Sequence, residues 1–106
     1  MLTTGKIVTR NDNYTGTTTV DNLARELTAA GKTWKSYAEG LPSVGYTGGN
    51  LHRYLKRHNP FAYFSDAQTG TVQNANLVPF SQFATDLSAN ALPDFSLIVP
   101  DACNDE

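Results

Sequence analysis

Two short apolar stripes with helical spacing restrict what this chain can fold into. The first consists of Val20, Leu23, Ala24 and Leu27, and the second consists of Phe80, Phe83, Ala84 and Leu87. Positions i, i+3, i+4 and i+7 share one face of an α-helix. The spacing therefore predicts two short amphipathic helices, each with one side buried.

Runs with strand character surround these two helices, at residues 6–9 (KIVT), 33–38 (TWKSYA) and 95–99 (FSLIV). A third short helix is expected over Leu51–Arg57, ended by Asn59-Pro60, because a residue before proline avoids the helical region. Residues 65–78 have the composition of a loop. This order predicts an α/β fold, in which a partial, mostly parallel sheet is flanked by helices. We treat residues 1–106 as a single partial domain.

The helix ends and the core can also be predicted. Thr19 suits the N-cap of the first helix, and Gly31 suits the position just after its last turn. Pro79 suits the start of the second helix, and Asn90 suits its end. The side chains expected inside are Leu23, Leu27, Phe83 and Leu87, packed against a sheet that contains Trp34 and Ile98.

Composition excludes several protein classes. Thr, Asn, Gly and Ser sum to 36 of the 106 residues, which favours turns over long helices. Five Phe, five Tyr and one Trp, with a net charge of −2, argue against a disordered chain. No run reaches the ~18 apolar residues of a membrane span. The opening residues Met1–Gly5 do not have the pattern of a signal peptide, and the single cysteine, Cys103, has no partner for an internal disulfide.

Charge is unevenly distributed along the chain. The first 57 residues carry eight basic and four acidic side chains, a net of +4, and the rest carries six acidic side chains without Lys or Arg, a net of −6. This asymmetry is either chance or a sign of two surfaces, one of them a carboxylate-rich patch that faces a cation. The basic and aromatic run His52–His58 is too short, in an acidic chain, to predict nucleic-acid binding. A solvated helix face explains it better.

Carboxylates follow two of the expected strands. Glu39 comes directly after the TWKSYA run, and Asp101 follows FSLIV, with Asn104 and Asp105 beyond it. In parallel α/β sheets, ligands bind beyond the carboxyl ends of the strands. The sequence therefore predicts that these side chains border a site.

Four segments in order resemble one protein family. They are residues 31–39 (GKTWKSYAE), residues 57–61 (RHNPF), the run Val78-Pro79-Phe80 with Phe83, Asp86 and Leu87, and the stretch from Leu92-Pro93 through Pro100-Asp101 to Asn104-Asp105. Together they resemble the bacterial phosphoesterase family of acid phosphatases and phospholipase C-type enzymes, within the alkaline phosphatase superfamily. The resemblance covers most of the chain and corresponds to the central part of such an enzyme.

The resemblance implies hydrolysis of phosphate esters by a Ser or Thr nucleophile. Family members carry that nucleophile upstream of a segment like Leu2–Gly5, so we identify no catalytic nucleophile in this chain. His58 and Asn59 are expected to contact the substrate, and Asp101 and Asp105 to bind a divalent metal ion through carboxylate oxygens. Glu39 and Asn104 are expected to support these ligands. The ligand set is expected to be incomplete within this chain, which alone should be inactive.

Other interpretations of the same residues remain open. His58 and Asn59 could brace the turn at Pro60, Asp101 could cap the turn after Pro100, and Glu39 could make structural hydrogen bonds. The alternative function is a non-catalytic α/β module that binds a ligand or partner through its Gly- and Asn-rich loops. Flanking sequence would discriminate: a Ser/Thr element before Met1 and a His-Asp pair after Glu106 would support the phosphoesterase. Family members are commonly exported, so the resemblance also implies an extracytoplasmic parent protein in which Cys103 pairs with a cysteine just beyond the motif.

Overall fold

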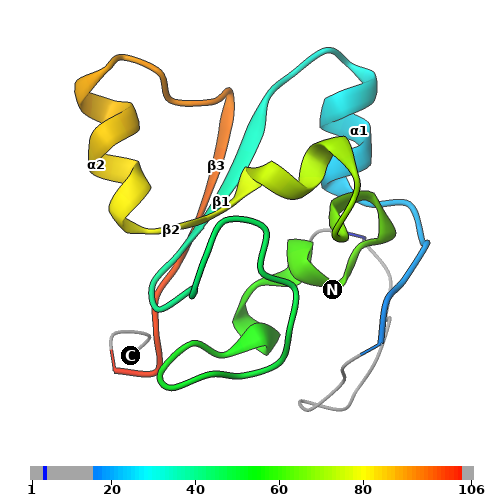
Figure 1. Ribbon diagram of the computed structural model, residues 1–106. Helices are drawn as coiled ribbons and strands as arrows, with labels where there is room; N and C mark the ends of the chain where they lie inside the picture. The colour runs from blue at the N-terminus through cyan, green and yellow to red at the C-terminus, as the bar shows by residue number, and fades with distance from the viewer. Residues whose placement is uncertain (1–3, 5–15, 104–106) are drawn as a thin grey trace.

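A three-stranded parallel sheet forms the centre of the computed structural model, which describes Thr4 and residues 16–103 (Figure 1). The central strand β1 is Trp34–Ala38, and its neighbours are β2, Leu77–Pro79, and β3, Phe95–Val99. Strand β3 pairs with the whole of β1, whereas β2 pairs only with the second half, from Ser36 onward. Helix α1 is Leu23–Ala29 and helix α2 is Ser81–Ser88. The predicted α/β class with a parallel sheet is confirmed.

The long segment between β1 and β2 contains four short 3₁₀ turns. These are η1 (Lys56–His58), η2 (Pro60–Tyr63), η3 (Ser65–Ala67) and η4 (Val72–Asn76). The predicted helix over Leu51–Arg57 is wrong. Leu51 and Tyr54 instead exchange backbone hydrogen bonds across a tight turn in which His52 has a φ of 53°. Strand β2 was missed because its first two residues belong to the expected loop 65–78 and Pro79 was expected to begin the second helix. The expected strand at residues 6–9 lies outside the described residues.

The helix ends follow local hydrogen bonding. The N-cap of α1 is Asn22, not Thr19, and its Oδ1 accepts the backbone N–H of Arg25 at 2.9 Å. Gly31 follows the last turn with a φ of 74°, and Asn90 follows α2 with a φ of 54°. Both residues adopt the left-handed conformation expected of the position just after a helix. Pro79 is the last residue of β2 rather than the first residue of α2.

One face of the sheet carries an aromatic core centred on Phe61. This side chain is fully buried and lies 4.7 Å from Trp34, 5.7 Å from Phe64 and 6.3 Å from Phe95, measured between ring centroids. Tilted and edge-to-face ring pairs of this kind add roughly 0.5–1.5 kcal/mol each beyond the area that they bury. Leu23 and Leu27 of α1 pack against this cluster and are partly buried. The apolar stripe of the first helix therefore faces the core, as predicted.

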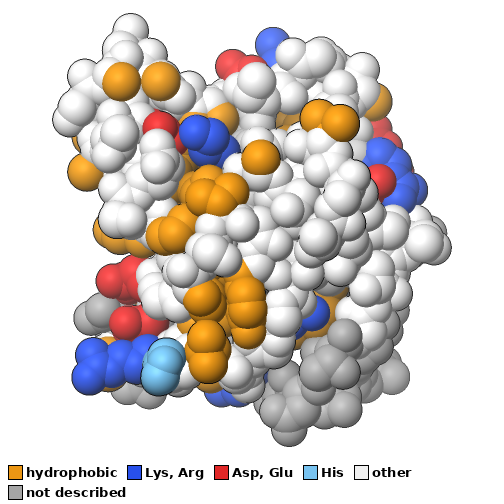
Figure 2. Space-filling model, in the orientation of Figure 1, with side chains coloured by type: hydrophobic (Ala, Val, Ile, Leu, Met, Phe, Trp, Pro, Cys, Tyr) orange, Lys and Arg blue, Asp and Glu red, His pale blue; other side chains and the backbone are white. Residues whose placement is uncertain are grey.

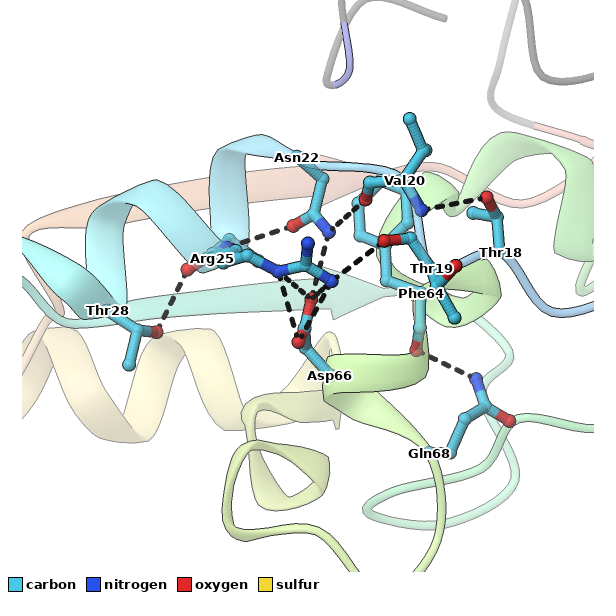
Figure 3. Close-up of polar contacts among 10 residues, drawn as sticks. Thr18, Thr19, Val20, Asn22, Arg25, Thr28, Phe64, Asp66 and Gln68 are labelled. Atoms are coloured by element: carbon cyan, nitrogen blue, oxygen red, sulfur yellow. Dashed lines mark hydrogen bonds and ion pairs between the residues drawn. The ribbon is translucent and has the colours of Figure 1, made fainter.

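Polar contacts attach the start of α1 to η3 (Figure 3). The carboxylate of Asp66 accepts hydrogen bonds from Asn22 Nδ2 at 2.9 Å and from Arg25 Nε at 3.2 Å. Arg25 also donates to the carbonyl of Thr19 at 3.0 Å. This network fixes the helix against the irregular segment that precedes β2.

The opposite face of the sheet packs on α2 through a polar group. The Asp86 carboxylate is buried and accepts hydrogen bonds from Lys35 Nζ at 2.7 Å, Tyr37 Oη at 2.8 Å and Gln82 Nε2 at 2.8 Å. The ring of Phe83 stands edge-on to Tyr37 at 5.2 Å between centroids.

This packing rotates the predicted apolar stripe of α2 away from the sheet. Leu87 is 56% exposed, so its predicted burial is wrong, and Ile98, which lies in the sheet as predicted, is 45% exposed. Phe83 is partly buried. The helix turns Asp86 inward because Lys35 and Tyr37 provide a charged and a hydroxyl partner there, and Leu87, one residue further on, faces outward. Within the described residues, no helix is long and apolar enough to cross a membrane.

We expect the fold to lose stability in acid through Asp86. Hydrogen bonds from Lys35, Gln82 and Tyr37 lower the pKa of this carboxyl to about 2, against an unfolded value of about 4. A depressed pKa stabilises the folded state above the unfolded value, and this stabilisation is lost as pH falls through about 2. Melting temperatures between pH 5 and pH 2 should therefore fall more steeply for the native chain than for Asp86→Asn. Parallel curves would contradict this assignment.

Candidate active site

Glu39 and Asp101 lie together at the carboxyl end of the sheet. The backbone N–H of Glu39 donates to the carbonyl of Val99 at 2.9 Å, which continues the pairing of β1 with β3 beyond Ala38. Glu39 Oε1 in turn accepts the N–H of Asp101 at 3.2 Å. Both residues are partly buried. The strand-end rule thus brings together two of the predicted site residues.

The residues after β3 also contact the turn that leads to His58. The N–H of Ala102 donates to the carbonyl of Arg53 at 2.9 Å, and the N–H of Cys103 donates to Asp101 Oδ1 at the same distance. Figure 2 shows acidic, basic and histidine side chains gathered at the lower left, where Figure 1 places the ends of β1 and β3. This end of the sheet is therefore polar, while apolar side chains extend above it.

The described residues do not form a metal site by themselves. Among Thr4 and residues 16–103, no three His, Cys, Asp or Glu side chains come close enough to hold a metal ion together. Asp101 already uses one carboxylate oxygen to cap the turn at Cys103. The predicted ligand Asp105 and its predicted support Asn104 lie outside the described residues.

Asn59 is fully buried, and both polar atoms of its side chain have partners inside the protein. Its Oδ1 accepts the hydroxyl of Ser36 at 2.6 Å, and its Nδ2 donates to the hydroxyl of Tyr54 at 3.2 Å. Desolvation raises the pKa of Tyr54 to about 12, so this phenol stays protonated. The geometry matches the bracing interpretation of Asn59: the carboxamide attaches the turn at Pro60 to the central strand.

His58 is held by its neighbours while its side chain stays partly accessible. It ends η1, with its N–H donating to the carbonyl of Leu55 at 3.0 Å, and Asn59 follows it in the core. An imidazole on such a rigid turn can donate a hydrogen bond to a phosphoryl oxygen.

Lys56, two residues before His58, is buried. Sequence reasoning missed this burial, because a lysine in a basic run is typical of a solvated surface.

The Gly-rich loop Ser43–Asn50 is attached to the segment before β2. Gly45 donates its N–H to the carbonyl of Leu77 at 2.7 Å, and Asn74 Nδ2 donates to the carbonyl of Gly45 at 2.9 Å. Gly45 has a φ of 80°, and any Cβ at this position would overlap the Asn74 side chain. The loop therefore needs glycine for both its backbone conformation and its close approach.

The sequence matches the description "Phosphoesterase family" over residues 3–106, almost the entire chain. The chain belongs to the phosphoesterase family. The family resemblance inferred from the sequence motifs is therefore confirmed.

Relatives of this chain occur in bacteria and fungi. A phosphatidylinositol-3-phosphatase of Mycobacterium tuberculosis is 39% identical over 84 residues, which cover 79% of this chain and 26% of the relative. A probable acid phosphatase of Kluyveromyces lactis is 29% identical over 81% of this chain and 22% of its own length. An acid phosphatase of Aspergillus fumigatus is 27% identical over 90% of this chain and 23% of its own length. The chain thus spans about a quarter of the relatives that it matches.

Removing the hydroxyl of Ser36 should destabilise the phosphoesterase. Ser36→Ala leaves the buried Oδ1 of Asn59 without its donor, and an unsatisfied buried acceptor costs about 1–3 kcal/mol of unfolding free energy. Urea unfolding of the two proteins measures this difference. Ser88→Ala, at the exposed end of α2, is the matched control and should change stability by less than ~0.5 kcal/mol. Equal stabilities for Ser36→Ala and the native chain would contradict the bracing role of Asn59.

Proposed function

We propose that this chain is the central part of a metal-assisted phosphoesterase domain whose Ser or Thr nucleophile lies upstream of Leu2–Gly5. The observation that carries the proposal is the position of His58, partly accessible on a turn whose next residue is fixed in the core. Four family-like segments, in order, support the same conclusion. The expected position of the nucleophile comes from the resemblance to the alkaline phosphatase superfamily.

In this proposal His58 binds the phosphoryl group. Charge builds up on the phosphoryl oxygens in the transition state, and a preorganised donor is more useful there than in the ground state. The imidazole of His58 donates to one of these oxygens, while Asn59 fixes the turn through its hydrogen bonds to Ser36 and Tyr54. Glu39 fixes the backbone of Asp101, so that this carboxylate stays at the carboxyl end of the sheet.

A divalent metal ion is part of the proposed site. Asp101 and Asp105 would each contribute carboxylate oxygens, and hard divalent cations need several such ligands that converge. The described residues do not supply that set. The remaining ligands are therefore proposed to come from parts of the enzyme outside residues 16–103.

We further propose a phosphomonoester as substrate. Both kinds of name among the relatives, phosphatidylinositol-3-phosphatase and acid phosphatase, describe removal of a phosphate group. The resemblance also supports export of the parent protein from the cytoplasm, with Cys103, which is exposed, paired outside the described residues. A full-length protein that remained in the cytosol would contradict the export proposal.

Two assays test the proposed activity. The full-length gene product should hydrolyse a chromogenic phosphomonoester when a divalent metal ion is present, and His58→Ala should lower kcat about 10²–10³-fold, as loss of one transition-state donor does. Residues 1–106 alone should show no turnover with Mg²⁺, Ca²⁺, Mn²⁺ or Zn²⁺, because loss of a nucleophile costs several orders of magnitude. A metal-dependent rate near 1 s⁻¹ from residues 1–106, in the ordinary enzyme range, would show that the site is complete within this chain. An inactive full-length protein that binds a ligand through the Gly-rich loop would favour the non-catalytic module.

A further inference from the structure

Lys56 is a buried cation. Its residue is only 6% exposed, its Nζ donates to the carbonyl of Thr47 at 2.9 Å, and the same atom lies 4.7 Å above the ring of Tyr63. The ion pairs of the described part of the chain are Arg25–Asp66 and Lys35–Asp86, and neither includes Lys56. Desolvation lowers the pKa of this ammonium below its ordinary value. Lys56 thus pays a desolvation cost that a carbonyl and an aromatic face offset only in part.

Stability alone does not explain a lysine at this position. An unbranched apolar side chain such as methionine could fill similar space and pack on Tyr63 without desolvating a charge, and such replacements of buried ions are often neutral or stabilising. What methionine cannot do is donate a hydrogen bond to Thr47. The distinctive contribution of Lys56 is therefore the attachment of one backbone segment to another.

The two segments attached by Lys56 are the Gly-rich loop and η1. Besides the bond from Nζ to Thr47, the backbone N–H of Lys56 donates to Asn50 Oδ1 at 2.9 Å. At its other end the loop is fixed by the bonds that join Gly45 to Leu77 and Asn74. The loop is thus fixed at both ends, and the hydrogen bonds of Lys56 fix the end that adjoins η1 and His58.

We propose that Lys56 is a positioning residue that orients His58 toward the phosphoryl group, an inference that rests on the proposed function. His58 lies between two buried side chains, Lys56 two residues before it and Asn59 one residue after it. A three-residue 3₁₀ turn has few hydrogen bonds of its own, and the bonds of Lys56 and Asn59 add to those that fix it. Asn59 fixes the turn to the sheet, and Lys56 fixes it to the Gly-rich loop.

The test combines kinetics with a measurement that does not need activity. In the full-length gene product, Lys56→Met should lower kcat/KM about 10–100-fold, the size of loss typical when a residue that orients a metal ligand is removed. Lys56→Arg, which keeps a charged donor, should retain most of the native kcat/KM. In a His58→Ala background, Lys56→Met should cause no further loss, because its effect passes through the imidazole. Lys32→Met, at an exposed site, is the matched control and should have the same kcat/KM as the native enzyme.

NMR spectra of the histidine side chains provide the second measurement. In the full-length protein the ring signals of His58 are identified as those that His58→Ala removes, and they should broaden or shift in Lys56→Met but not in Lys32→Met. If Lys56→Met does not fold, Asn50→Ala removes the other bond between the loop and η1 from an exposed position and should change the His58 signals in the same way. Unchanged His58 signals, or additive losses in the double variant, would overturn the positioning role. An inactive native enzyme would instead overturn the proposed function, and the His58 signals would still decide whether Lys56 orders this turn.

Discussion

The buried carboxamide of Asn59 connects the irregular part of the molecule to its regular part. Between β1 and β2 the chain forms only 3₁₀ turns and loops, which cannot satisfy their polar groups in the way that a helix or a sheet does. Both polar atoms of the Asn59 side chain form hydrogen bonds, Oδ1 with Ser36 on the central strand and Nδ2 with Tyr54 in the preceding turn. The aromatic core around Phe61 begins two residues later, so this polar contact sets where the core packs against the sheet.

The two faces of the sheet are stabilised in different ways. The face toward α1 is apolar and well covered, and its energy comes from buried rings and aliphatic groups. The face toward α2 depends on Asp86, which is buried only because Lys35, Tyr37 and Gln82 all donate to it. A buried ion pair adds little net stability, but it fixes the rotation of α2, and Leu87 and Ile98 are left at the surface as a result.

The predictable parts of this fold are those whose signals are local. The strands around Trp34 and Phe95 were predicted from their side chains, and Gly31 and Asn90 from the conformation that follows a helix. Strand β2 was not predictable in this way, because three residues become a strand only through pairing with β1. The inward rotation of Asp86 depends in the same way on partners that lie far along the chain.

The candidate site shows the same division. The meeting of Glu39 and Asp101 follows from the topology of parallel strands, so it was predictable once two strands were identified. The choice of His58 came from the family-like motif at Asn59-Pro60, not from any pattern of charge. The burial of Lys56 and Asn59 had no local signal, since both residue types are usually exposed. Only the tertiary structure shows that both are buried on either side of His58 in the sequence.

The uneven charge along the sequence is matched in part within the fold itself. Both ion pairs of the described residues join the basic first part of the chain to the acidic second part: Arg25 pairs with Asp66, and Lys35 pairs with Asp86. Each pair also fastens a helix, α1 through Arg25 and α2 through Asp86, to an element distant in sequence. Two complementary segments of the chain thus fold onto one another. A phosphoryl site is proposed from position instead, because Glu39 and Asp101 lie where parallel strands end and the turn of His58 is fixed by the buried Lys56 and Asn59.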